Sequence, residues 1–321
     1  MTFGKYRVII NIVVILQFKD ENIMKLQFIR HNVLPIIAAF IWGMAFVAQS
    51  KCADLVEPFT MNAIRAIIAF GFLLVMFLAV RRMEEKNGHK KPIPWKQAIK
   101  GGTLCGIFLA TATNLQQFGI IGTSAGKAGF ITSCYIVFVP VLGIFVKKKC
   151  PLNVWISVII AAFGLYFLCV KEGFKVAPSD VYVMICSVMF AIHIMVIDKY
   201  TAEVGGILLS MIQFLVVSVI SAVFMLIFEK PDSVNIMKCM SSLVYLGIFS
   251  SGVAYTLQII AMKGANPAVV SLLLSFESVF AAIGGALLLH EKLGVQELIG
   301  CALMFCAVIL AQINFKKKIS E

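Results

Sequence analysis

Three ionisable side chains stand inside long apolar runs of this sequence, at Arg65, His193 and Glu277. In lipid such a side chain costs several kcal/mol unless it is paired or hydrated, so each needs a role. Arg65 could bind a substrate carboxylate or phosphate, because a guanidinium makes bidentate contacts with such groups. It could equally be a structural charge that reaches the membrane interface or pairs with Glu57. Glu277 and His193 could carry a proton or gate a pathway, or could be hydrogen-bonded packing residues.

Uncharged polar and aromatic residues within the apolar runs could complete a binding site. Gln117 and Gln258 recur at the same place in two similar parts of the chain, and Asn114 and Tyr255 recur one turn earlier. Such side chains could form the hydrogen-bonding wall of a cavity, or could join helices to one another. The predicted substrate-binding residues are Arg65, Asn62, Trp42, Asn114, Gln117, Tyr135, Tyr255 and Gln258. Proton linkage or gating is predicted for Glu277 and His193.

The elements that carry these residues are apolar runs of about 20 residues each. At a rise of about 1.5 Å per residue, a helix of that length crosses the hydrocarbon core of a bilayer. The links between the runs are short and leave no room for a separate soluble domain. The sequence predicts an all-α membrane protein with ten transmembrane helices, at residues 32–50, 58–80, 100–120, 125–146, 152–170, 179–197, 206–228, 241–261, 267–289 and 295–314.

Composition and charge agree with a membrane protein and exclude a soluble one. Sixty per cent of the 321 residues are hydrophobic and 14% are charged, whereas soluble domains carry about 25% charged residues. The net charge of +12 does not indicate nucleic acid binding, because the basic residues lie in short loops and tails. With the N-terminus inside, twenty Lys and Arg fall on inner segments and seven on outer ones. This bias predicts a multi-pass protein of the cell membrane with both termini in the cytoplasm.

Motifs for other chemistry are missing from the sequence. It holds no P-loop, HExxH or GxSxG motif, and its nine cysteines fall mostly in apolar runs without metal-ligand spacing. We therefore predict no enzymatic activity, no cofactor and no metal site. The predicted partners are a small-molecule substrate and the lipid bilayer, and a homodimer remains open.

The first residues differ from the rest of the chain. The apolar stretch from Val8 to Leu16 is too short to cross a membrane, and Met24 begins a segment that leads directly into the first helix. Met24 is therefore expected to be the natural start. The predicted divisions are an N-terminal tail 1–31, a first five-helix repeat 32–171, a second 172–314, and a basic cytoplasmic tail 315–321.

The chain contains an internal duplication. Shifted by 141 positions, residues 101–170 overlie residues 242–311 without a gap, so that Gln117 meets Gln258. The earlier parts of the two halves pair at a shift of 148 positions. Each half holds five predicted helices, an odd number, so the second half must enter the membrane upside down relative to the first. Inverted repeats of this kind are typical of transporters, with a site near the bilayer midplane where the halves meet.

Two segments resemble a known family. AFIWGMAFVAQ at 39–49, with EPFTMNAIRA at 57–66, resembles the opening of an EamA-type repeat, and SFESVFAAIGGALLLHEKLGVQELIGCALMFCAVILAQ at 275–312 resembles its closing hairpin. The chain is thus similar to EamA-type transporters of the drug/metabolite transporter superfamily over nearly everything beyond Met24. The resemblance implies ten helices in two inverted halves, a central cavity and the movement of small metabolites. It implies no particular substrate.

These observations together predict a secondary transporter or exporter of a small polar organic metabolite, amino acid-like or other, that works by alternating access. Two alternatives stay open. A flippase for a lipid-linked substrate would need a lateral opening from the lipid to a polar groove. A non-transporting membrane scaffold would have no central polar cavity at all.

Overall fold

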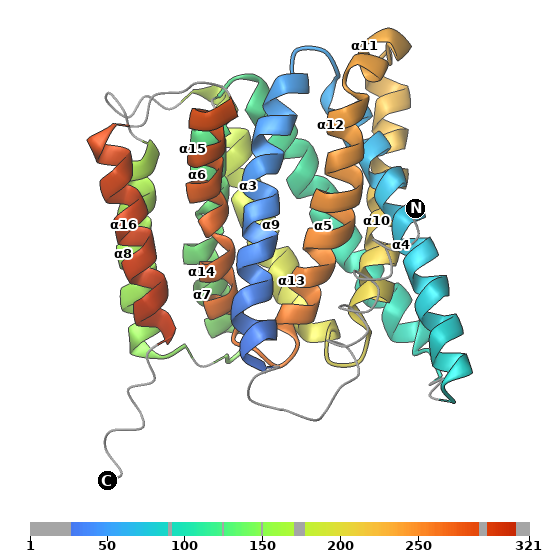
Figure 1. The fold of residues 1–321 in the computed structure, drawn as a ribbon, viewed down its shortest axis with the longest axis horizontal. Helices are drawn as coiled ribbons and strands as arrows, with labels where there is room; N and C mark the ends of the chain where they lie inside the picture. Colours follow the sequence, from blue (N-terminus) through green and yellow to red (C-terminus); the bar gives the residue numbers. More distant parts are fainter. Residues whose placement is uncertain are drawn as a thin grey trace.

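The computed structural model describes residues 27–88, 92–123, 125–148, 150–169, 177–288 and 294–312, and the regular elements in these ranges are all helices. The predicted N-terminal tail up to residue 26, with the expected start at Met24, lies outside the described residues, as does the basic tail 315–321. Figure 1 shows the helices standing side by side in a single bundle. The predicted all-helical class is confirmed.

Eight helical segments in the described ranges are long and apolar enough to cross a membrane. Two more apolar helices, α8 (Leu152–Cys169) and α16 (Val295–Gln312), are shorter in their apolar part. The prediction of ten spans is therefore confirmed in part. The eight are η1 (Ile29–Val33) with α3 (Leu34–Cys52), α4 (Pro58–Lys86), α5 (Trp95–Ile121), α6 (Ala125–Ser133) with α7 (Tyr135–Phe145), α9 (Pro178–Tyr200), α10 (Gly206–Phe228), α12 (Met240–Tyr245) with η2 (Leu246–Ala254) and α13 (Tyr255–Met262), and α14 (Pro267–Leu274) with α15 (Phe276–Leu288).

The helices begin where the sequence supplies a start signal. Pro58, Pro178 and Pro267 stand in the first turn of α4, α9 and α14, where a missing N–H costs nothing. The side chain of Asn266 also accepts the backbone N–H of Ala268 at 3.0 Å, which caps α14. Successive membrane-crossing segments run in opposite directions through the bundle (Figure 1).

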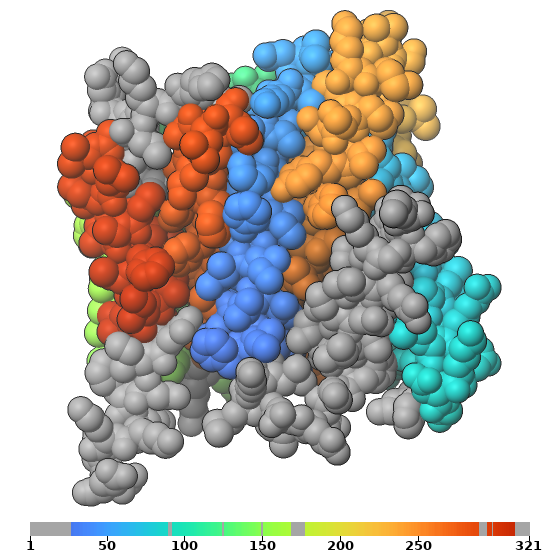
Figure 2. Space-filling model, in the orientation of Figure 1, coloured from blue at the N-terminus to red at the C-terminus, as the bar shows by residue number. Residues whose placement is uncertain are grey.

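The helices pack in pairs that join distant parts of the sequence. α4 lies along α10, α5 along α9, α8 along α16 and α3 along α15. In Figure 2, α3 crosses the visible face between α14–α15 on one side and α12–η2 on the other. Gly43 allows the contact with α15, because a β-carbon there would lie only 2.4 Å from that of Phe280. Small residues commonly bring membrane helices this close.

Three of the predicted continuous helices are irregular in the structure. Cys134 separates α6 from α7, and Ser275 separates α14 from α15, at positions that correspond through the shift of 141. The span that begins at Met240 contains the π-helix η2, whose i→i+5 hydrogen bonds make a wider turn than an α-helix. These interruptions surround the cavity described next.

Candidate functional site

A narrow polar cavity lies inside the bundle, lined by side chains from α3, α4, α5, the two broken helices, α9, η2 and α13. About 460 Å³ of space outside the atoms lies in and around it, and about 30 Å³ is open to the centre of a water molecule. That is room for roughly two waters, so a larger ligand requires the helices to move apart. The polar and aromatic lining residues are Trp42, Phe46, Gln49, Arg65, Gln116, Thr132, Tyr135, Phe190, Ser250, Tyr255, Gln258 and Glu277.

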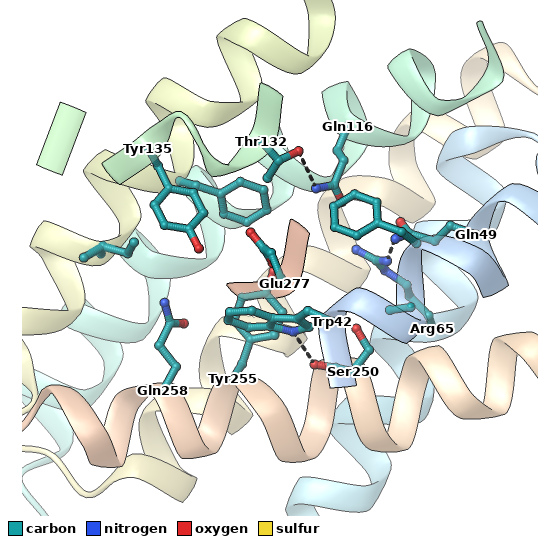
Figure 3. Close-up of a pocket in the computed structure, with 14 residues that line it drawn as sticks. Trp42, Gln49, Arg65, Gln116, Thr132, Tyr135, Ser250, Tyr255, Gln258 and Glu277 are labelled. Atoms are coloured by element: carbon teal, nitrogen blue, oxygen red, sulfur yellow. Dashed lines mark hydrogen bonds between the residues drawn. The ribbon is translucent and has the colours of Figure 1, made fainter. Parts of the chain in front are cut away.

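The structure brings six of the ten predicted site residues together in this lining: Trp42, Arg65, Tyr135, Tyr255, Gln258 and Glu277. They lie along the cavity in Figure 3, with Arg65 at one end, Glu277 between, and Gln258 at the other end. The other four, Asn62, Asn114, Gln117 and His193, are buried outside the lining.

Arg65 is held inside the bundle rather than at its surface. Only 4% of the residue is exposed, and its Nη1 donates to the Oε1 of Gln49 at 3.1 Å. The alternative pairing with Glu57 is not formed, since that carboxylate accepts the backbone N–H of Lys230 instead. Within the described residues no carboxylate lies at ion-pair distance from Arg65. A buried guanidinium without a counter-ion is costly, so its position in a cavity wall calls for an anionic partner.

Glu277 links the two broken helices. It lies in the first turn of α15, directly after the interruption at Ser275, where the helix dipole favours a negative charge. Its Oε1 accepts a hydrogen bond of 3.4 Å from Ser133, the last residue of α6. The hydroxyl of Tyr135, in the first turn of α7, points toward the same carboxylate (Figure 3). A change in the proton content of Glu277 would therefore act on both helix interruptions.

Trp42 and Tyr255 form an aromatic part of the cavity wall. Their ring centroids are 4.7 Å apart and the rings are tilted by 58°. The indole Nε1 of Trp42 donates to the backbone carbonyl of Ser250 in η2 at 3.1 Å, which fixes the indole (Figure 3). Such a wall can pack against a planar or apolar part of a ligand.

Gln116 lines the cavity where Gln117 was predicted. Gln116 donates to the hydroxyl of Thr132 at 3.1 Å, whereas Gln117 is fully buried outside the lining. Its counterpart Gln258 does line the cavity. α5 and its counterpart in the second half therefore turn different residues toward the cavity. Gln258 follows the π-helix η2, whose wider turns rotate the later residues about the helix axis, whereas α5 is a regular α-helix. Nothing in the sequence marked that π-helix.

Asn62 and Asn114, predicted to contact substrate, contact each other instead. The amide of Asn62 in α4 donates to the Oδ1 of Asn114 in α5 at 2.9 Å, and Asn114 donates to Ser221 in α10 at 3.0 Å. His193 is also used in packing: its Nε2 lies 3.1 Å from the Oε1 of Gln213. Polar side chains at membrane depth find partners on neighbouring helices, and here that helix-joining alternative is the one observed.

Comparison with known proteins assigns the chain to a family. Residues 31–170 and 177–312 each match the model of the EamA-like transporter family. The chain belongs to the EamA-like transporter family. Each of the two EamA-like segments contains one of the broken helices, and the cavity takes residues from both. The chain is thus a multi-pass membrane protein of a transporter family, as the resemblance of its opening and closing motifs predicted.

Individual relatives of this EamA-like chain are also called transporters. An uncharacterized transporter of Archaeoglobus fulgidus is 27% identical over 279 residues, which cover 87% of this chain and 84% of that protein. The uncharacterized transporter YcxC of Bacillus subtilis is 24% identical, over 90% of this chain and 96% of that one. A crystal structure with a TM-score of 0.69 and 16% identity, covering 88% of this chain and 96% of that chain, shares the fold.

Proposed function

We propose that this EamA-like protein is a secondary transporter or exporter that moves a small polar organic metabolite by alternating access. The observation that carries this proposal is Arg65, a buried guanidinium in the wall of a cavity inside a membrane bundle. The amide of Gln49 lies against it, and no carboxylate among the residues that the structure describes does. An ionisable residue at such depth marks a substrate or ion pathway by default. The substrate accordingly carries an anionic group, as an amino acid-like metabolite does.

The proposed architecture has ten membrane-spanning helices in two inverted five-helix halves, 32–171 and 172–314, with both termini in the cytoplasm. Three features support it. Successive helices alternate in direction (Figure 1). The contacts of α4 with α10 and of α8 with α16 join helices at corresponding places of the two halves. The interruptions at Cys134 and Ser275 correspond as well. Rocking of one half against the other opens the cavity to each side in turn.

In the proposed mechanism Arg65 binds the anionic group of the substrate, and Tyr255 and Gln258 supply hydrogen bonds further along the cavity. Trp42 and Tyr135 pack against the rest of the molecule. Gln258 supports this role because its Oε1, buried in the wall, has no hydrogen-bond partner in the part of the chain that the structure describes. Such an acceptor is costly to bury unless a ligand or water donates to it.

Efflux from proteoliposomes tests the proposal directly. Vesicles containing the full chain are loaded with the small-molecule fraction of a cell extract, and mass spectrometry follows which compounds leave. Wild-type vesicles should lose a defined set of metabolites, and Arg65→Ala vesicles should retain it. The matched control is Arg82→Ala, because Arg82 is an exposed residue near the other end of the same helix. Wild-type efflux by a folded Arg65→Ala protein would remove Arg65 from the site.

Proton linkage is assigned to Glu277 and tested in the same vesicles. An imposed pH gradient should drive net movement of the substrate by the wild type. Glu277→Gln, which keeps an acceptor oxygen for Ser133, should remove the response to the gradient. A wild-type rate indifferent to the gradient would contradict proton linkage and leave facilitated diffusion.

A further inference from the structure

Gln49 meets Arg65 at one end of the cavity. Gln49 lies in the last turn of α3, and its Oε1 accepts the hydrogen bond from Arg65 Nη1 at 3.1 Å. The two residues are 3% and 4% exposed, and both line the cavity. An amide oxygen orients a guanidinium but carries no net charge. A glutamate at the same place would instead form a charge-assisted contact and neutralise the arginine. Because Gln49 is neutral, it leaves the positive charge of Arg65 uncompensated.

The other polar groups of the cavity leave this charge uncompensated too. Among the described residues of the lining the carboxylate is Glu277, which is hydrogen-bonded to Ser133 on α6 and makes no ion pair with Arg65. Gln116, the other glutamine of the cavity near this end, directs its amide to Thr132 and is neutral as well (Figure 3). One end of the cavity thus presents a cation whose hydrogen-bond partner, Gln49, is neutral.

We infer that Gln49 is a positioning residue that holds Arg65 ready for an oxyanion, and that the cavity selects ligands carrying a carboxylate or a phosphate ester over uncharged ligands of the same shape. This inference rests on the proposed function of the cavity as the substrate site. It adds that selectivity for charge depends on the neutrality of residue 49. Beyond Arg65, the rings of Trp42 and Tyr255 favour a ligand with a flat apolar portion next to its anionic group.

The test uses Trp42 as a reporter inside the cavity. The chain has three tryptophans, and Trp95→Phe with Trp155→Phe leaves the indole of Trp42 as the single one. Fluorescence of the purified full chain is titrated with benzoate, phenyl phosphate and benzamide. At least one oxyanion should bind at least tenfold more tightly than benzamide, and the comparison of benzoate with phenyl phosphate distinguishes a carboxylate site from a phosphate site.

Charge placed on residue 49 should abolish this selectivity. Gln49→Glu should weaken oxyanion binding at least tenfold and leave benzamide binding unchanged. Gln116→Glu is the matched control, since it adds the same charge to the cavity on the side of Thr132 and should weaken oxyanion binding less. In an Arg65→Met background, Gln49→Glu should have no further effect, because coupled residues are not additive. If Gln49 had a purely structural role, the ratio of oxyanion affinity to benzamide affinity would be the same in these variants as in the wild type.

Three results would overturn the inference. They are unchanged oxyanion binding by Gln49→Glu, equal binding of benzamide and the oxyanions by the wild type, and absence of binding for all three probes. Each leaves the proteoliposome result untouched, so transport by the wild type together with any of them would reject the role of Gln49 while the proposed function stands. Efflux by Arg65→Ala vesicles would reject the proposed function itself.

Discussion

Removal of the Glu229 carboxylate should destabilise the helix that carries Arg65. Glu229 follows the last residue of α10, and its two oxygens accept from the N–H of Phe59 at 2.8 Å and from the N–H and hydroxyl of Thr60 at 2.6 and 2.7 Å. Those N–H groups belong to the first turn of α4, where the helix itself offers no acceptor. The carboxylate of one helix thus caps another that lies far away in the sequence.

The magnitude follows from the groups left without a partner. A side-chain cap contributes about 0.5–2 kcal/mol, and a negative charge at a partly exposed helix N-terminus adds about 0.3–1 kcal/mol. Glu229→Ala should therefore lower the free energy of unfolding by about 1–3 kcal/mol. Unfolding of the purified protein by SDS in mixed micelles, followed by circular dichroism, measures this difference.

The neighbouring Glu57 provides the matched control. It is exposed and accepts a single hydrogen bond of 3.1 Å, from the backbone N–H of Lys230. Glu57→Ala should consequently change the free energy of unfolding by less than about 0.5 kcal/mol. Equal losses in the two variants, or a loss below that level in Glu229→Ala, would refute the capping argument.

Two further pairs of variants test packing and charge in the same unfolding assay. Gly43→Ala should lower the free energy of unfolding by about 1–3 kcal/mol, because its β-carbon would collide with Phe280. Gly71→Ala, in open space on α4, should raise it by about 0.5–1 kcal/mol. An unchanged free energy of unfolding in Gly43→Ala would contradict the close contact. Lys127→Met and Asp180→Asn both remove the same 2.6 Å ion pair, but Lys127→Met should lower the free energy of unfolding more. The reason is that the aspartate side chain is 5% exposed and the lysine side chain 27%. The lysine that remains in Asp180→Asn can reach water, whereas the aspartate that remains in Lys127→Met cannot. Equal losses of unfolding free energy in the two variants would contradict this argument.

Apolar patterning was sufficient to predict the helical rods. The span expected at 206–228 matches Gly206–Phe228, and the one expected at 58–80 begins at Pro58 and continues to Lys86. Bilayer thickness imposes a length on apolar runs, and proline marks the starts, so these features are readable from the residues alone. The interruptions at Cys134 and Ser275 cannot be read from the sequence in this way, because a helix break of one residue leaves the apolar pattern unchanged.

The candidate site was predictable where the residue type itself is unusual for a membrane. Arg65 and Glu277 stand out as charges in apolar runs, and the structure brings both to the cavity. Neutral amides carry a weaker signal, because the same side chain can face a cavity or a neighbouring helix. Asn62 lies outside the lining and contacts Asn114, and the closeness of α4 to α5 there depends on packing that the sequence does not reveal. Gln49 was not among the predicted site residues, because its importance comes from its contact with Arg65.

The basic and the acidic residue of the cavity come from different family-matched segments. Arg65 lies in residues 31–170 and Glu277 in residues 177–312. The position corresponding to Arg65 in the second segment is Gln213, and the one corresponding to Glu277 in the first is Ile136. A homodimer of the first segment would face two guanidinium groups with no acid, and a homodimer of the second would face two acids with no guanidinium. If the gene were cut between the segments, only co-expression of the two unlike pieces could rebuild the pocket. The two segments therefore differ in the charge that they bring to the pocket, and the pocket needs one copy of each.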